Sequence, residues 1–301
     1  MAAAGNALRA WHAAMICACL SAAPALAVTE KIDVVTSIPP LAMLAREVGG
    51  EHVDITALLG GASTPHSYSP RPSDAVAVSR ADLVVFVGGG LDDWTRDLLD
   101  ASGKALVVEL LPANGSDHGH DHAHGHAADP HVWLDPAWTR DDLVPALVRS
   151  LSQLKPQAAA RFEAQGRIVR ERLTNLEEDI RQMFQKATMR KFVAFHPAWG
   201  RFAARFDLQP IGAIEESGGE EPTLRSLVAT MRAARSAGVR AILVEPQMNP
   251  RVAVTLADEL GAGVVTVDPY GDLDSFDRDT YQDLMMLNAA AFAQALAVSS
   301  E

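Results

Sequence analysis

Residues 155–186 read KPQAAARFEAQGRIVRERLTNLEEDIRQMFQK. After Pro156, apolar or small side chains recur at alternating steps of four and three, at Phe162, Gly166, Val169, Leu173, Leu176, Ile180 and Met183. This spacing predicts one long amphipathic helix, ~45 Å in length at 1.5 Å per residue. A coiled-coil dimer would need the same spacing, but only about three heptads are present. We therefore expect a stiff helix that packs along the rest of the chain.

The chain on either side of this helix alternates short apolar runs with helix-like segments, which predicts parallel βαβ units. The expected strands are 32–36, 53–58, 83–87 and 105–110 before the helix, and 192–195, 208–214, 241–244 and 263–267 after it. The expected helices are 40–48, 72–79, 92–100, 199–206, 223–236, 252–260 and 279–298. The fold class is α/β: two similar (βα)4 lobes, 28–150 and 189–301, joined by a rigid linking helix, 151–188.

Charge and composition exclude several classes of protein. The 301 residues carry 26 Lys+Arg and 38 Asp+Glu, for a formal charge of −12. A nucleic-acid binder would need a basic surface to neutralise phosphates, and a protein held to an anionic membrane by charge would need a polybasic segment. Neither is present, so we expect no nucleic-acid partner and no membrane-surface role.

Residues 1–27 have the pattern of a secretory signal peptide: Arg9, then an apolar run over 11–20, then the small-residue triplet 25–27. The run is too short to span a bilayer. Lipid attachment at Cys19 is the second alternative. Since the chain has two cysteines, Cys17 and Cys19, cleavage after Ala27 would leave no thiol. Any metal would then bind through His, Asp, Glu or water, in the periplasm.

Five of the ten histidines fall in one short tract, residues 117–126, at His118, His120, His122, His124 and His126. Gly, Ala and Asp separate them, so the tract offers no apolar face to bury. We expect a flexible loop whose imidazoles bind a transition metal ion such as zinc in an auxiliary role. A mobile loop holds no fixed geometry, which argues against a catalytic centre there.

Three other histidines and one aspartate stand at distinctive places. His66 lies in a Gly- and Pro-rich loop after the second expected strand, and His196 and Asp268 directly follow later strands. His131 follows the His-rich tract. Ligands of open α/β sheets bind beyond the carboxyl ends of the strands. Three imidazoles and one carboxylate match the four-coordinate nitrogen and oxygen sites that zinc prefers.

The segments around these four residues resemble the metal-binding solute-binding proteins of ABC importers, cluster A-I, and within them the zinc-specific, ZnuA-like group. The resemblance covers the chain from residue 28 almost to its end. It rests on Pro65-His66-Ser67-Tyr68, Arg71-Pro72-Ser73-Asp74, Asp129-Pro130-His131-Val132-Trp133-Leu134-Asp135-Pro136, Phe195-His196-Pro197-Ala198-Trp199 and Asp268-Pro269-Tyr270-Gly271.

The resemblance implies one metal ion in a cleft between the lobes, held by His66, His131, His196 and Asp268. It implies capture of Zn²⁺ for a membrane permease that a cytoplasmic ATPase powers, and no enzymatic activity. In this family a histidine at the position of His196 goes with zinc, whereas glutamate there goes with manganese. Some zinc-binding members carry an acidic residue before the first histidine; Pro65 stands there in this chain, which places the role of fourth ligand on Asp268.

Other functions stay open at this point. An exported zinc-dependent hydrolase would also bind zinc, although no His-Glu-x-x-His motif occurs. A metal buffer or an adhesin of the same fold needs no transport partner, and Mn²⁺ is the alternative cargo. We expect the protein to act as a monomer.

Overall fold

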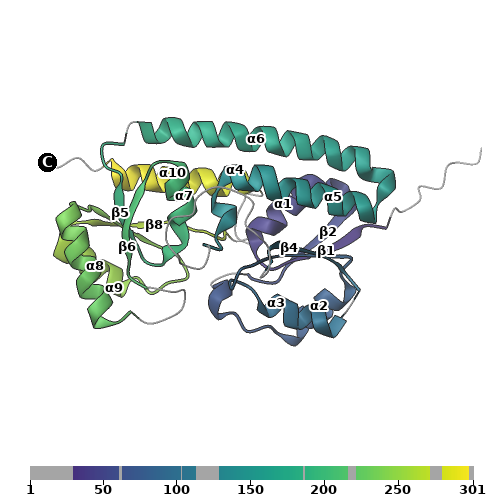
Figure 1. Cartoon of the computed structure of the whole chain (residues 1–301), viewed down its shortest axis with the longest axis horizontal. Coiled ribbons are helices and arrows are strands. Elements are labelled where there is room, and N and C mark those ends of the chain that lie inside the picture. Colours follow the sequence, from purple (N-terminus) through teal and green to yellow (C-terminus); the bar gives the residue numbers. More distant parts are fainter. Residues whose placement is uncertain are drawn as a thin grey trace, which may run out of the picture. The chain divides into compact units, whose positions relative to one another are not determined.

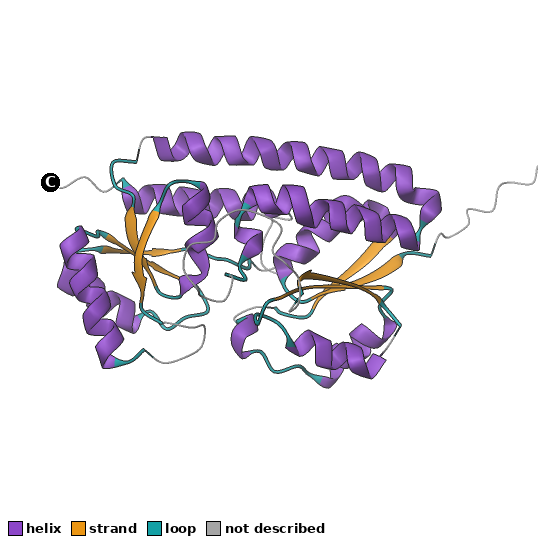
Figure 2. Cartoon of the chain, viewed as in Figure 1, coloured by secondary structure: helices purple, strands orange, loops and turns teal. Residues whose placement is uncertain are grey.

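The fold is built on two four-stranded parallel sheets. The computed structural model describes residues 30–60, 63–102, 104–112, 129–185, 187–215, 222–271 and 280–297. Helices lie on both faces of each sheet (Figure 2). Residues 31–301 belong to one compact unit. The expected signal peptide, 1–27, and the His-rich tract, 117–126, lie outside the described residues. No helix in the part of the chain that the structure describes is long and apolar enough to cross a bilayer.

The first sheet is formed by β1 (Ile32–Thr36), β2 (Val53–Ala57), β3 (Leu83–Gly88) and β4 (Leu106–Leu111), in the order β2-β1-β3-β4. All three strand pairs are parallel. The connecting helices are α1 (Pro39–Gly49), α2 (Pro72–Arg80) and α3 (Trp94–Ser102). Every residue of β3 is buried, as expected of a central strand with helices on both faces.

The second sheet repeats this arrangement with β5 (Lys191–Ala194), β6 (Gln209–Ala213), β7 (Ala241–Val244) and β8 (Gly263–Thr266), in the order β6-β5-β7-β8. Its helices are α7 (Gly200–Arg205), α8 (Leu224–Ala237), α9 (Arg251–Leu260) and α10 (Tyr281–Leu296). In both sheets the second strand is at the edge, beside the first. The predicted α/β class with two similar four-stranded parallel sheets is confirmed, whereas the division into domains at 150 and 188 stays a prediction.

A helical segment that the sequence analysis did not anticipate precedes the long helix. It consists of α4 (Pro136–Trp138), a π-helical turn over Thr139–Leu143 and α5 (Val144–Leu154). The carboxylate of Asp135 caps its start by accepting from the backbone N–H groups of the next turn. Pro145 lies just after the wider π turn, where its missing N–H and bulky ring are tolerated. Leu143, Leu147 and Leu151 recur at helical steps, and proline is common in the first turn of a helix, so the sequence does carry the pattern of this helix.

The long helix is α6 (Ala159–Gln185); a 3₁₀ turn over Pro156–Ala158 replaces its predicted first residues. It contacts α1 and α5 of the first half of the chain and α10 of the second half (Figure 1). The buried stripe is Phe162, Gly166, Val169, Leu173, Leu176, Ile180 and Phe184. The predicted stripe is buried through Ile180. Its last member, Met183, is half-buried and packs against the core, whereas the next residue, Phe184, is fully buried and was not predicted.

Aromatic side chains anchor α6 at both ends. Phe162 packs edge-on against the ring of His52, with 5.6 Å between ring centroids. Phe184 lies 6.0 Å from Phe202 and 6.5 Å from Phe292, both edge-on. One continuous cluster of buried apolar residues includes side chains from both sheets and from α6. The helix is therefore part of a shared core, which is what makes the connection between the halves stiff.

This packing predicts that Phe184→Ala destabilises the protein by about 3–5 kcal/mol, because it leaves a cavity among three aromatic rings. Met183→Ala, one residue earlier, is the matched control and is expected to lower stability by less than half as much. Urea unfolding followed by circular dichroism measures both variants. Equal losses would contradict the assignment of Phe184 to the core.

Candidate metal centre

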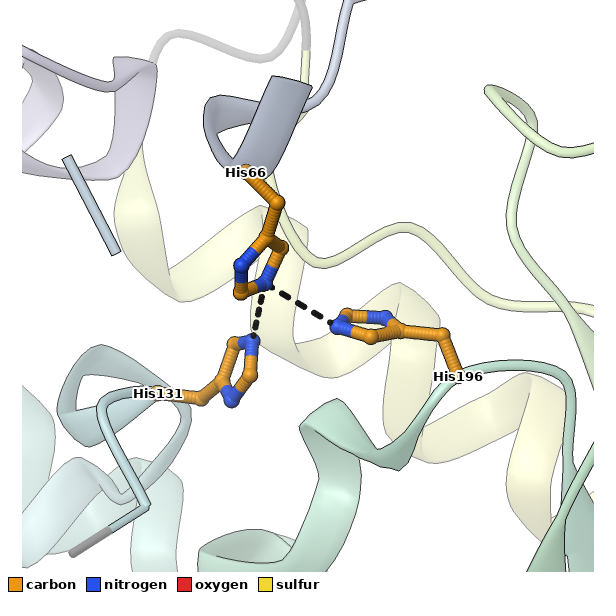
Figure 3. A group of neighbouring side chains, drawn as sticks. All are labelled: His66, His131 and His196. Atoms are coloured by element: carbon orange, nitrogen blue, oxygen red, sulfur yellow. Dashed lines mark hydrogen bonds between the residues drawn. The ribbon is translucent and has the colours of Figure 1, made fainter. Parts of the chain in front are cut away.

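Three histidines from distant parts of the sequence converge on one point (Figure 3). The Nε2 atom of His66 lies 3.4 Å from Nε2 of His131 and 3.3 Å from Nε2 of His196. One ring nitrogen from each of the three lies within 4.8 Å of the others. His131 and His196 are buried, and His66 is half-buried.

The spacing of these nitrogen atoms is that of a zinc coordination sphere. Zinc–nitrogen bonds of 2.0–2.1 Å at tetrahedral angles place neighbouring ligand nitrogens about 3.3–3.4 Å apart. The two measured separations, 3.4 and 3.3 Å, fall in this range. His66 thus lies at the separation expected between two ligands of one zinc ion from each of the other two rings.

A short 3₁₀ turn after β2 positions His66. This turn, Pro65–Ser67, begins at Thr64, whose hydroxyl accepts a hydrogen bond from the backbone N–H of His66. The indole of Trp94 donates to the carbonyl of Pro65 over 3.1 Å. Because Trp94 begins α3, the turn is tied to the first half of the chain.

His131 stands at the start of another 3₁₀ turn, Val132–Leu134. The indole of Trp133 in this turn donates to the carbonyl of Pro269 over 2.7 Å. The hydroxyl of Tyr281, at the start of α10, donates to the carbonyl of Trp133. His131 precedes α6 in the sequence, yet these bonds tie its turn to the second half of the chain.

Two arginines of α7 hold the residues that flank this turn. Arg201 donates to the carbonyl of Asp129 over 2.8 Å, and Arg205 binds both carboxylate oxygens of Asp135, at 2.9 and 2.8 Å. Since His196 lies just before α7, the same short stretch of chain supports two of the three histidines.

Carboxylates orient two of the three rings. Nδ1 of His131 lies 2.7 Å from Oδ1 of Asp129, and Nδ1 of His196 lies 2.8 Å from Oε1 of Glu245. A carboxylate accepts the Nδ1 proton, so the Nε2 lone pair of each ring faces the centre. The sequence analysis missed both roles. Glu245, an acidic residue directly after the apolar strand β7, could have been noticed by its position alone.

Burial and neighbouring charges favour the neutral forms of His66 and His131. Burial, together with the charges that His131 and His196 would carry, lowers the pKa of His66 to about 3. Burial also lowers the pKa of His131, although the hydrogen bond and charge of Asp129 oppose that shift. Burial alone would raise the pKa of Asp129, but its bonds to His131 and the charge of Arg201 bring it below the usual value. Neutral imidazoles beside an ionised carboxylate are the state that binds a metal.

The structure does not place Asp268 in the group of three histidines. Its Oδ1 atom accepts from the backbone N–H groups of Tyr270 and Gly271, each at 3.0 Å. Its own backbone N–H and carbonyl bond the side-chain amide of Asn288, at 2.7 and 2.6 Å. These bonds hold the loop after β8 in a defined conformation.

Comparison with known proteins also indicates a zinc-binding protein. A family model described as "ZnuA: Zinc-uptake complex component A periplasmic" matches residues 34–295. The high-affinity zinc uptake system protein ZnuA of Bacillus subtilis is 26% identical over 286 residues, covering 90% of this chain and 89% of that protein. The manganese-binding lipoprotein MntA of Halalkalibacterium halodurans is 28% identical over 285 residues, covering 89% of each.

Among solved structures, a zinc-bound ZnuA deletion mutant superimposes with a TM-score of 0.78 at 26% identity, covering 90% of this chain and all of that one. The family consists of transport binding proteins, so the prediction that the chain is no enzyme is confirmed. From the family match and the shared fold we conclude that this chain belongs to the ZnuA family of zinc-uptake complex components.

Proposed function

We propose that this protein captures Zn²⁺ in the periplasm and delivers it to a membrane ABC permease driven by a cytoplasmic ATPase. One observation carries the proposal: Nε2 of His66 lies 3.4 Å from Nε2 of His131 and 3.3 Å from Nε2 of His196, the separations expected between ligands of one tetrahedral zinc ion. The ligands in this proposal are His66, His131, His196 and, through Oδ2, Asp268. The protein works as a monomer, exported by the signal peptide 1–27.

The donor set favours zinc over manganese as cargo. Imidazole nitrogens suit zinc, whereas manganese prefers sites rich in oxygen. The similarity to a manganese-binding lipoprotein makes Mn²⁺ the competing cargo. Four protein ligands would close the coordination sphere. A closed site suits capture and transfer of an ion, because a catalytic zinc keeps one position open for water.

Each of the substitutions His66→Ala, His131→Ala and His196→Ala is expected to weaken zinc binding at least 100-fold, because each removes one of the few donors that hold the ion. His52→Ala is the matched control; its ring packs against Phe162, outside the cluster, so zinc affinity should not change. Isothermal titration calorimetry with Zn²⁺ and, separately, Mn²⁺ measures the affinities. Deleting residues 117–126 should leave the tight site intact, and tight binding by all three alanine variants would refute the proposed site.

Asp268→Asn tests the fourth ligand separately. Asparagine keeps the Oδ1 acceptor for the amides of Tyr270 and Gly271 but replaces the charged Oδ2. We expect zinc affinity to fall about 10-fold or more, since a carboxylate ligand is lost, with the urea midpoint of the zinc-free protein unchanged. Unchanged affinity would mean that another group completes the site.

The pH dependence of zinc binding follows from the lowered pKa values. Three imidazoles with the ordinary pKa of about 6.5 would cost up to three decades of affinity per pH unit below that value. Burial lowers the pKa of His66 to about 3 and also lowers the pKa of His131, so protons compete with zinc for these two rings only at lower pH. Between pH 6.5 and 5, affinity should therefore fall by clearly less than three decades per unit. Competition with a chelator of known pH dependence measures the slope, and a slope near three would contradict the prediction.

A further inference from the structure

Glu245 follows β7 directly and is almost completely buried, with 2% of its surface exposed. One carboxylate oxygen, Oε1, lies 2.8 Å from Nδ1 of His196. The other, Oε2, is buried and has no hydrogen-bond partner among the described residues. Glu245 is not in the group of donors that could share one ion with the three histidines. It therefore acts on the site through the ring of His196.

The bond to Glu245 determines which nitrogen of His196 carries the proton. A carboxylate can only accept, so the proton sits on Nδ1 and the lone pair of Nε2 points at the cluster. The negative charge also raises the basicity of the imidazole as a ligand. In carboxylate–histidine–metal arrangements such partners contribute about 10–100-fold in metal affinity.

The same carboxylate is unfavourable when no cation is present. Burial deprives it of water, and its one ion-pair contact within the described residues is the ring of His196, which carries charge only when protonated. A buried carboxylate with an unsatisfied oxygen destabilises the fold. A divalent cation on Nε2 would bring positive charge to the opposite side of the same ring and offset this penalty.

We propose that Glu245 is a positioning residue that raises the affinity for zinc and lowers the stability of the zinc-free protein. It orients His196, and its buried charge is uncompensated until the zinc ion binds. This inference rests on the proposed function. It predicts that removing the charge lowers the affinity for zinc and raises the stability of the zinc-free protein. A purely structural role for Glu245 would not produce these opposite changes.

Glu245→Gln tests the proposal because glutamine has the same shape without the charge. We expect zinc affinity to fall 10–100-fold and the urea midpoint of the zinc-free protein to rise above that of the wild type. ¹⁵N NMR of the histidine rings should show the Nδ1–H form of His196 in the wild type and a weakened preference for it in the variant, since an amide can also donate to Nδ1.

Asp129→Asn is the matched control at His131. The Asp129 side chain is 30% exposed, and its Oδ1 accepts both the backbone N–H and the Nδ1–H of His131, so its charge is hydrated and hydrogen-bonded and we expect it to stabilise the fold. This substitution should also weaken zinc binding, but it should lower the urea midpoint of the zinc-free protein.

The outcomes separate the two proposals. Wild-type protein that binds no zinc would refute the proposed function, whatever the variants do. Wild type that binds zinc, with Glu245→Gln binding it equally well, would refute the role of Glu245 alone. A zinc-free Glu245→Gln protein that is less stable than the wild type, or unfolded, would also refute it, because Glu245 would then be an ordinary structural residue.

Discussion

The hydrogen bond from the buried indole of Trp133 to the carbonyl of Pro269 is the constraint on which the metal centre depends. It joins a turn that precedes α6 to a loop that follows β8. Tyr281 and the arginines of α7 add further bonds to the same turn. His131 is thereby fixed beside His196 as one rigid pair. The third donor, His66, comes from the other half of the chain.

The shared core holds the two halves of the chain in a fixed relative position. Because α6 is anchored by aromatic contacts at both ends, and because buried residues of both sheets form one cluster, relative motion of the halves would expose apolar surface. A stiff frame of this kind limits how far the three ring nitrogens can move apart. Preorganised ligands lose little conformational entropy on binding, which favours high affinity for the ion.

Electrostatics complete the site. Burial lowers the pKa of His66 and His131, so these two donors are neutral near pH 7. The carboxylates of Asp129 and Glu245 each lie at Nδ1 of a histidine, on the side of the ring away from the cluster. The net charge of the chain, −12, excludes nucleic acid as a partner but does not identify the ligand; the cluster of imidazoles is what indicates a metal cation.

Sequence patterns alone determined the α/β class, the two four-stranded sheets and the apolar stripe of the long helix, because burial imposes a period on residues that are close in the chain. They also singled out the three histidines, by their positions after strands and by motif. They missed the helical segment around Pro145, although Leu143, Leu147 and Leu151 recur there at helical steps. They also missed the burial of Phe184, because steps of three and four from Ile180 reach both Met183 and Phe184, and only packing against Phe202 and Phe292 decides between them. The roles of Asp129 and Glu245, the attachment of His131 to the second half, and the Nε2 separations were decided by tertiary structure only. Each depends on contacts between residues far apart in the sequence, which a local pattern does not encode.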